Sequence, residues 1–117
     1  MLLVVEDEPL LRMMAVDLAE DAGFQVVEAA NANDAVGILE KRGDVRIVFT
    51  DIDMPGGMDG MRLAACIRDR WPPIDIIMTS GYARPDPEAL PARTEFFSKP
   101  YRHEQVTAAM RRMTAVA

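Results

Sequence analysis

The chain has 117 residues, half of them apolar, and we expect a single domain over residues 1–117 with one sizeable core. Its 13 basic and 19 acidic residues give a formal net charge of −6, which opposes the phosphate backbone of nucleic acids, so direct nucleic-acid binding is not expected. The apolar opening meets charge at Glu6, too early for a signal peptide or a membrane span, and the single cysteine excludes an internal disulfide, so we expect a cytoplasmic protein.

Short apolar runs rich in β-branched or aromatic residues alternate with segments in which apolar residues recur at the helical period. The predicted strands are residues 2–5, 24–27, 46–50, 74–79 and 94–98. Strands that alternate with helices in this way indicate βαβ units, and hence a parallel sheet covered by helices on both faces.

Cap residues place the ends of the predicted helices. The first begins at Pro9, which suits a first helical turn, and ends before Gly23, which suits a C-terminal cap. The side chains expected on its buried face are Leu11, Met14, Ala15, Leu18 and Ala22. Further helices are predicted from a cap at Asn31 or Asn33 to Gly43, from Asp59 to the prolines at 72–73, and across residues 106–113.

A fourth helix is due between the fourth and fifth strands, where residues 81–93 read GYARPDPEALPAR. The three prolines leave room for one or two turns, because proline interrupts a helix and constrains the residue before it. We therefore predict a short or mobile fourth helix.

Acidic residues follow two of the predicted strands, at the edge where parallel sheets bind their ligands. Glu6 and Asp7 come directly after the first strand, and Asp51 comes after the third. If these two strands are neighbours, the three carboxylates share one small pocket and need a counter-charge. A hard divalent cation such as Mg²⁺ suits them, since it binds one or two carboxylates and keeps positions for water and a phosphate oxygen.

Each acidic residue then has an expected task. Asp7 and Asp51 would bind Mg²⁺ directly. Glu6 would hold a metal-bound water, and the main-chain carbonyl of Asp53 would supply another oxygen. With the metal in place, Asp51 can act as a nucleophile on a phosphoryl group and form an acyl phosphate.

Two residues after the later strands suit the oxygens of such a phosphoryl group. Lys99 follows the fifth strand and would share the neutralisation of their charge with Mg²⁺. Ser80 follows the fourth strand and offers a hydroxyl. His103, by contrast, is interpreted as a solvated residue in the first turn of the last helix.

Four motifs in this order resemble the receiver domains of response regulators over nearly the whole chain, namely VVEDE at 4–8, TDIDMPGGMDG at 50–60, MTSGYA at 78–83 and FFSKPY at 96–101. The resemblance implies a flavodoxin-like (βα)5 fold, a doubly wound parallel sheet with strand order 2-1-3-4-5. It also implies phosphorylation of an aspartate by a sensor histidine kinase or a phosphotransfer protein.

Carried over by position, the resemblance implies a role for each residue of the motifs. Asp51 matches the phosphoacceptor, Glu6 and Asp7 the acidic pair, Asp53 the carbonyl ligand, Ser80 the switch hydroxyl, Lys99 the lysine, and Phe96 the aromatic residue that changes rotamer. The peptide bond between Lys99 and Pro100 is commonly cis in such proteins.

Three features depart from the family's common pattern. The loop within 55–60 has one glycine more than usual, which bears on the phosphoryl lifetime and the metal affinity. The SGY at 80–82 and the prolines after it resemble a subgroup of receivers that differ in this region, so the output face is expected to be remodelled. Phe96 lacks the hydroxyl of the more usual tyrosine, so no polar contact from it is assumed.

The functional hypothesis is a phosphorylation-operated switch rather than an enzyme. Phosphorylated Asp51 attracts the hydroxyl of Ser80, Phe96 fills the space left behind, and a downstream protein target reads the change. A single-domain regulator, monomeric or weakly dimeric, is the first interpretation, and a receiver module of a hybrid kinase is the second. A flavodoxin-like nucleotide binder would need a Gly-rich phosphate loop after the first strand, and a metal-dependent phosphatase would turn over free phosphate esters.

Overall fold

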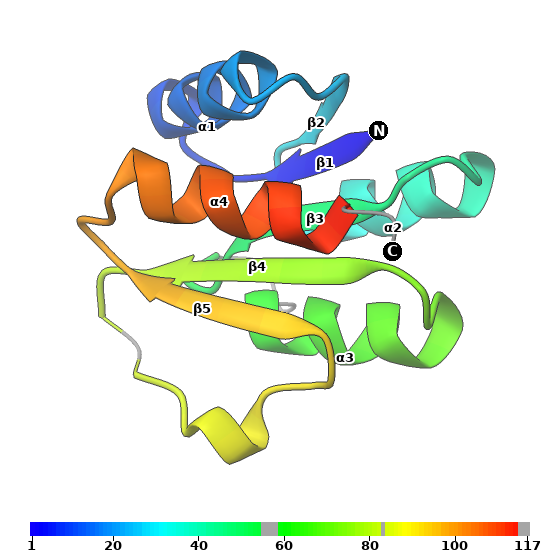
Figure 1. Ribbon diagram of the computed structural model, residues 1–117. Coiled ribbons are helices and arrows are strands. Elements are labelled where there is room, and N and C mark those ends of the chain that lie inside the picture. The colour runs from blue at the N-terminus through cyan, green and yellow to red at the C-terminus, as the bar shows by residue number, and fades with distance from the viewer. Residues whose placement is uncertain (55–58, 83, 115–117) are drawn as a thin grey trace.

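The computed structural model describes residues 1–54, 59–82 and 84–114, and its parallel sheet lies between two layers of helices (Figure 1). The elements in chain order are β1 (Leu2–Val5), α1 (Pro9–Asp21), β2 (Val26–Ala29), α2 (Ala32–Lys41), β3 (Ile47–Asp51), α3 (Gly60–Arg70), β4 (Asp75–Ser80), η1 (Pro87–Ala89), β5 (Thr94–Ser98) and α4 (His103–Thr114). The strand order is β2-β1-β3-β4-β5 and each pairing is parallel, so the predicted doubly wound fold is confirmed. Within these ranges, no helix has the length and apolar composition needed to cross a bilayer.

The sheet separates two hydrophobic cores. Leu3, Val5 and Val48 belong to the core under α2 and α3. Leu2 and Val4 belong to the core under α1 and α4. Successive residues of a strand point to opposite faces, which is why β1, an interior strand, is apolar at every position.

The second strand begins and ends two residues later than predicted, whereas the boundaries of the other four strands agree with the prediction within one residue. α1 ends at Asp21 and is followed by Gly23, whose φ of 100° lies in the left-handed region. The N–H of Gly23 donates to the carbonyl of Glu20, and the N–H of Phe24 donates to the carbonyl of Ala19. This pattern is a Schellman cap, and Phe24 packs against the core beside α1 as its hydrophobic contact. The prediction that Phe24 starts a strand was therefore wrong, because the residue completes the end of the helix.

α1 buries a narrower face than its apolar spacing predicted. Ala15, Leu18 and Ala19 are buried, whereas Met14 is 51% exposed and lines an open cavity instead of the packed core. The helical period shows which residues share a face. How many of them are covered depends on the distance to the neighbouring helix.

The predicted short fourth helix is a single 3-10 turn, η1. The side chain of Asp86 caps it by accepting the N–H of Glu88 at 3.0 Å. The chain re-enters the sheet through Arg93, whose φ is 60° and whose guanidinium pairs with Asp75 at 2.9 Å. The prolines of this segment thus reduce the helix between β4 and β5 to one turn.

α3 starts in close contact with the end of β3. Its cap is Asp59, whose Oδ1 accepts the N–H of Arg62 at 3.0 Å. The N–H of Gly60 donates to the carbonyl of Ile52 at 3.0 Å. A β-carbon on Gly60 would collide with the carbonyl oxygen of Asp51 and would lie 2.7 Å from Cα of Ile52. Glycine at position 60 therefore permits the approach that holds the backbone around Asp51.

Gly60→Ala is expected to lower the free energy of unfolding by roughly 2 kcal/mol or more, because backbone atoms on both sides of the contact must move. Gly37 in α2 is the matched control, since its β-carbon would enter open space. Gly37→Ala should raise the free energy of unfolding by about 0.5–1 kcal/mol. Urea unfolding followed by circular dichroism measures both changes, and a Gly60→Ala protein as stable as wild type would contradict the close approach.

Candidate functional site

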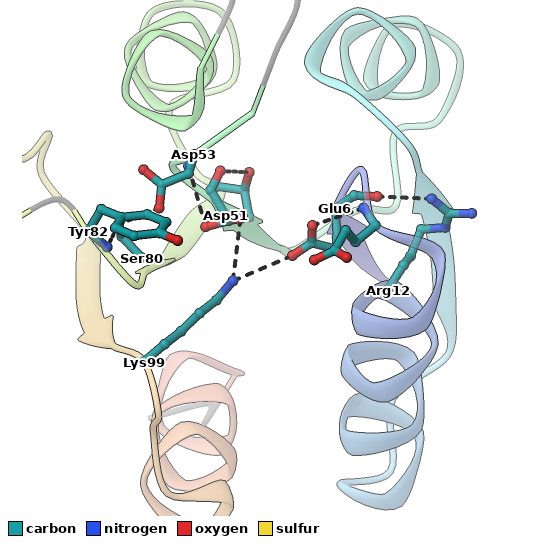
Figure 2. A network of polar contacts seen from close by, with 9 residues as sticks. Glu6, Arg12, Asp51, Asp53, Ser80, Tyr82 and Lys99 are labelled. Carbon is teal, nitrogen blue, oxygen red and sulfur yellow. Dashed lines mark hydrogen bonds and ion pairs between the residues drawn. The ribbon is translucent and has the colours of Figure 1, made fainter.

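The polar residues singled out from the sequence meet at the carboxyl edge of the sheet (Figure 2). Glu6 follows β1, Asp51 ends β3, Ser80 ends β4 and Lys99 follows β5. β1 and β3 are neighbours in the sheet, as the predicted pocket requires. Four elements that are far apart in the sequence thus bring their side chains to one place.

Three carboxylates form the acidic cluster that the sequence predicted. Glu6, Asp7 and Asp51 each offer an oxygen, and these oxygens all lie within 4.8 Å of one another. Glu6 and Asp51 are buried. Oxygen ligands grouped in this way are the set that hard divalent cations prefer, so the donor set fits Mg²⁺.

Lys99 is the counter-charge within the cluster. Its Nζ lies 3.4 Å from Oδ2 of Asp51 and 3.7 Å from Oε1 of Glu6. Figure 2 shows the extended side chain reaching between the two carboxylates from the end of β5. One ammonium group serves two buried acids, which leaves the cluster with excess negative charge.

The pKa values of the two buried acids are both raised, chiefly by their burial. Burial raises the pKa of Glu6 to about 7, with repulsion from Asp51 adding to the rise, while the N–H of Glu8 and the charge of Lys99 oppose it. Burial also raises the pKa of Asp51, and the nearby Lys99 ammonium opposes that rise. A bound divalent cation would favour the ionised form of both carboxylates.

Arg12 is a residue of this edge that the sequence did not single out. Its Nη1 donates to the main-chain carbonyl of Glu6 at 3.0 Å, and its Nε pairs with Glu28 at 3.0 Å. The guanidinium of Arg12, on α1, therefore connects the backbone just after β1 to the side chain of Glu28 on β2. A lone arginine on a helix carries no signal in the sequence for such a contact.

Ser80 and Asp53 contact each other through their side chains. The hydroxyl of Ser80 donates to Oδ2 of Asp53 at 2.6 Å, and its oxygen accepts the N–H of Tyr82 at 3.1 Å. The N–H of Asp53 lies 3.4 Å from Oδ1 of Asp51. The sequence predicted a role only for the main-chain carbonyl of Asp53, as a metal ligand. The adjacency of β3 and β4 was the signal that would have suggested the side-chain contact.

The remaining predicted residues lie around this cluster. Phe96 is half-buried in β5 and packs against the core on the α2 and α3 side of the sheet. The peptide bond between Lys99 and Pro100 is cis, as expected. His103 is exposed in the first turn of α4, also as expected. The additional glycine of the loop lies within residues 55–58, outside the described part of the chain.

A cavity of about 320 Å³ opens beside the cluster, between α1 and α4. Leu11, Met14 and Tyr101 line its apolar side, and Asp51 and Lys99 border it. Its existence depends on the spacing of two helices over the sheet, which no local pattern in the sequence reports. The acidic cluster thus borders a cavity with apolar residues in its lining.

Known proteins resemble this chain over most of its length. A family model described as response regulator receiver domain matches residues 2–111. The sensor kinase CckA of Brucella abortus (strain 2308) is 39% identical over 116 residues, which make up 95% of this chain and 12% of that protein. The chain therefore spans only a small part of the length of this relative.

Solved structures share the whole fold. A response regulator receiver protein from Sinorhizobium medicae WSM419 has 25% identity and a TM-score of 0.87, over 96% of this chain and 91% of that one. The response regulator TrrA of Thermotoga maritima, solved in complex with Mg²⁺ and BeF, has 25% identity and a TM-score of 0.84 over 96% of each chain.

The raised pKa values predict how stability depends on pH. Between about pH 5 and pH 7 the folded protein binds more protons than the unfolded chain, since the pKa of Glu6 is about 7 against an ordinary 4.5. In protein freed of divalent cations by a chelator, the free energy of unfolding should therefore fall as pH rises through this window. The Glu6 contribution is at most on the order of 3 kcal/mol, and the raised pKa of Asp51 acts in the same direction.

Chemical unfolding at a series of pH values tests this dependence. Glu6→Gln is the matched control, and its stability should vary less with pH across the window. Millimolar Mg²⁺ should restore stability at about pH 7.5 in the wild type, because it binds the ionised carboxylates. Identical pH profiles for wild type and Glu6→Gln would contradict the assignment.

Proposed function

The chain belongs to the family of response regulator receiver domains, and we propose that it is the phosphoacceptor of a two-component phosphorelay. Asp51 receives a phosphoryl group from a sensor histidine kinase or a phosphotransfer protein, in the presence of Mg²⁺. The phosphorylated chain then signals through contact with a downstream protein target. Receivers are signalling switches, and this chain acts as one rather than turning over a free substrate.

One observation carries the proposal, namely the position of Lys99 between two buried carboxylates. A structural ion pair needs one acid for one base. Here the ammonium lies within 4 Å of both Asp51 and Glu6, at the edge of a parallel sheet where ligands bind. The arrangement supplies a nucleophilic oxygen together with a positive charge beside it.

The chemistry follows from these positions. A carboxylate oxygen of Asp51 attacks the phosphorus atom, and the bond from phosphorus to the donor imidazole nitrogen breaks, with the imidazole keeping the electron pair. Lys99 neutralises charge on the phosphoryl oxygens. Ser80, at the end of the adjacent strand, offers its hydroxyl to another of these oxygens.

The metal ligands and the aromatic residue complete the proposal. Glu6, Asp7 and Asp51 would hold Mg²⁺ together with the main-chain carbonyl of Asp53. When bound, the cation supplies a second positive charge for the phosphoryl oxygens. Phe96 on β5 would change rotamer to fill the space that Ser80 leaves.

A receiver module of a larger sensor kinase is the second candidate arrangement. The relative at 39% identity favours it, because that protein is a sensor kinase and the match covers only 12% of its length. The phosphoacceptor chemistry at Asp51 is the same in both arrangements. They differ in whether the phosphoryl donor is a separate protein.

The surface next to the site suits a protein donor better than a small molecule. Leu10, Met13 and Met14 on α1 are 66%, 59% and 51% exposed, and Met14 lines the cavity that Asp51 borders. Large apolar side chains exposed together mark protein contacts. A partner that delivers a phosphoryl group to Asp51 would cover these side chains on its way to the cavity.

Intact-protein mass spectrometry after incubation with acetyl phosphate tests the acceptor. We expect one phosphoryl adduct in the wild type that requires Mg²⁺ and is absent from Asp51→Asn. Asp17→Asn, which removes an exposed carboxylate of α1, should be labelled like the wild type. An adduct that persists in Asp51→Asn would exclude Asp51 as the acceptor.

Phosphotransfer from a histidine kinase tests the protein donor. For a kinase that phosphorylates the wild type, Met13→Glu should slow labelling by roughly tenfold or more. The substitution puts a charge into an apolar contact that the bound kinase would bury. Labelling by acetyl phosphate should stay unchanged. Ala108→Glu on the exposed side of α4 is the matched control. Equal loss with both donors would place the effect in the site itself and contradict a docking role for α1.

A further inference from the structure

The carboxylate of Asp53 has no task in the proposed chemistry, which uses only its main-chain carbonyl. It nevertheless makes a short contact, accepting the Ser80 hydroxyl at 2.6 Å (Figure 2). Hydrogen bonds from a hydroxyl to a carboxylate fall in this range and are about twice as strong as neutral ones. The residue proposed to move on phosphorylation is therefore held by an acidic neighbour.

This contact uses the hydroxyl proton of Ser80 that a phosphoryl oxygen on Asp51 would need. A serine hydroxyl has one proton, and a carboxylate can only accept, so the proton of Ser80 is directed to Asp53. Ser80 is fully buried at the end of β4, which limits its movement to rotation of the side chain. To donate to a phosphoryl group on Asp51, Ser80 must give up its bond to Asp53.

The same rotation would also affect the backbone beyond β4. The Ser80 oxygen accepts the N–H of Tyr82 at 3.1 Å, and Tyr82 is 90% exposed at the start of the proline-rich segment. Turning the hydroxyl away from Asp53 moves that acceptor. The contact between Asp53 and Ser80 is thereby linked to the segment that leads to η1.

We propose that Asp53 is a positioning residue that stabilises the unphosphorylated state by competing for the hydroxyl of Ser80. The inference rests on the proposed function and deepens it, since it names a regulatory contact of the same site. Loss of the Asp53 carboxylate should favour the phosphorylated form of the site. A residue that acted only through its negative charge would have the same effect with or without Ser80.

A double-mutant cycle separates these two mechanisms. Trifluoroberyllate, an analogue of the phosphoryl group, is titrated at saturating Mg²⁺ into the full chain, and its dissociation constant is measured by calorimetry. The four proteins are wild type, Asp53→Ala, Ser80→Ala and the double variant. Asp53→Ala should tighten binding by about tenfold, the equivalent of one hydrogen bond to a charged group. In the Ser80→Ala background the same change should have less than about a threefold effect, because no hydroxyl remains to compete for.

Two control variants sharpen the reading. Asp53→Asn keeps a neutral acceptor for Ser80, so its affinity for trifluoroberyllate should fall between those of wild type and Asp53→Ala. Glu8→Gln removes an exposed acidic charge at the same edge and should leave the affinity unchanged. Thermal unfolding of each variant confirms that it is folded.

The outcomes distinguish this inference from the function on which it rests. Equal tightening with and without Ser80, or no tightening at all, would overturn the role of Asp53 while the receiver function stands. A folded wild type that binds no trifluoroberyllate in the presence of Mg²⁺ would overturn both.

Discussion

The burial of two carboxylates side by side is the constraint on which the rest of the structure depends. Glu6 and Asp51 lose most of their contact with water at the end of the sheet. Buried acids of like charge repel one another and lose hydration, so they persist only with a positive charge nearby. Lys99 supplies that charge, and the proposed Mg²⁺ would supply the remainder. Lys99 and a divalent cation together would therefore balance the charge of the three carboxylates.

The fold supports this arrangement through backbone contacts close to each acid. Gly60 lets the start of α3 lie against the carbonyl of Asp51, and Arg12 holds the carbonyl of Glu6. The N–H of Glu8 donates to the Glu6 carboxylate at 3.1 Å. Each contact fixes a main-chain position next to a charged side chain. The two helix layers thus serve the site from both faces of the sheet, with α3 on one face and α1 on the other.

The hydroxyl of Ser80 would have two competing acceptors in the phosphorylated protein. Asp53 accepts its proton in the structure, and a phosphoryl group on Asp51 would compete for the same proton. A switch needs two arrangements of similar free energy, so that a local change of charge can select one of them. The short turn η1 is the next element in the chain after β4, which Ser80 ends. The region that differs most from a regular helical layer is thereby connected to the residue that is proposed to move.

Local patterns in the sequence predicted much of the fold but not which of the apolar residues become buried. The alternation of strand and helix periods predicted the parallel sheet, and the three prolines predicted a short fourth helix. Phe24 was misassigned because an apolar residue after a helix can serve a cap as well as a strand. Met14 was misassigned because its period places it on the inner face of α1, whereas the gap to α4 leaves it exposed.

The sequence by itself determined which residues reach the edge of the sheet, since Glu6, Asp51, Ser80 and Lys99 each stand where a predicted strand ends. Strand ends and helix caps are local properties that a few neighbouring residues specify. Only the tertiary structure decided which of these residues contact one another. The bond from Ser80 to Asp53, the place of Lys99 between two acids and the cavity beside Met14 depend on distances of a few ångströms between segments far apart in the chain. Those distances are set by the packing of helices on the sheet, and a one-dimensional pattern does not contain them.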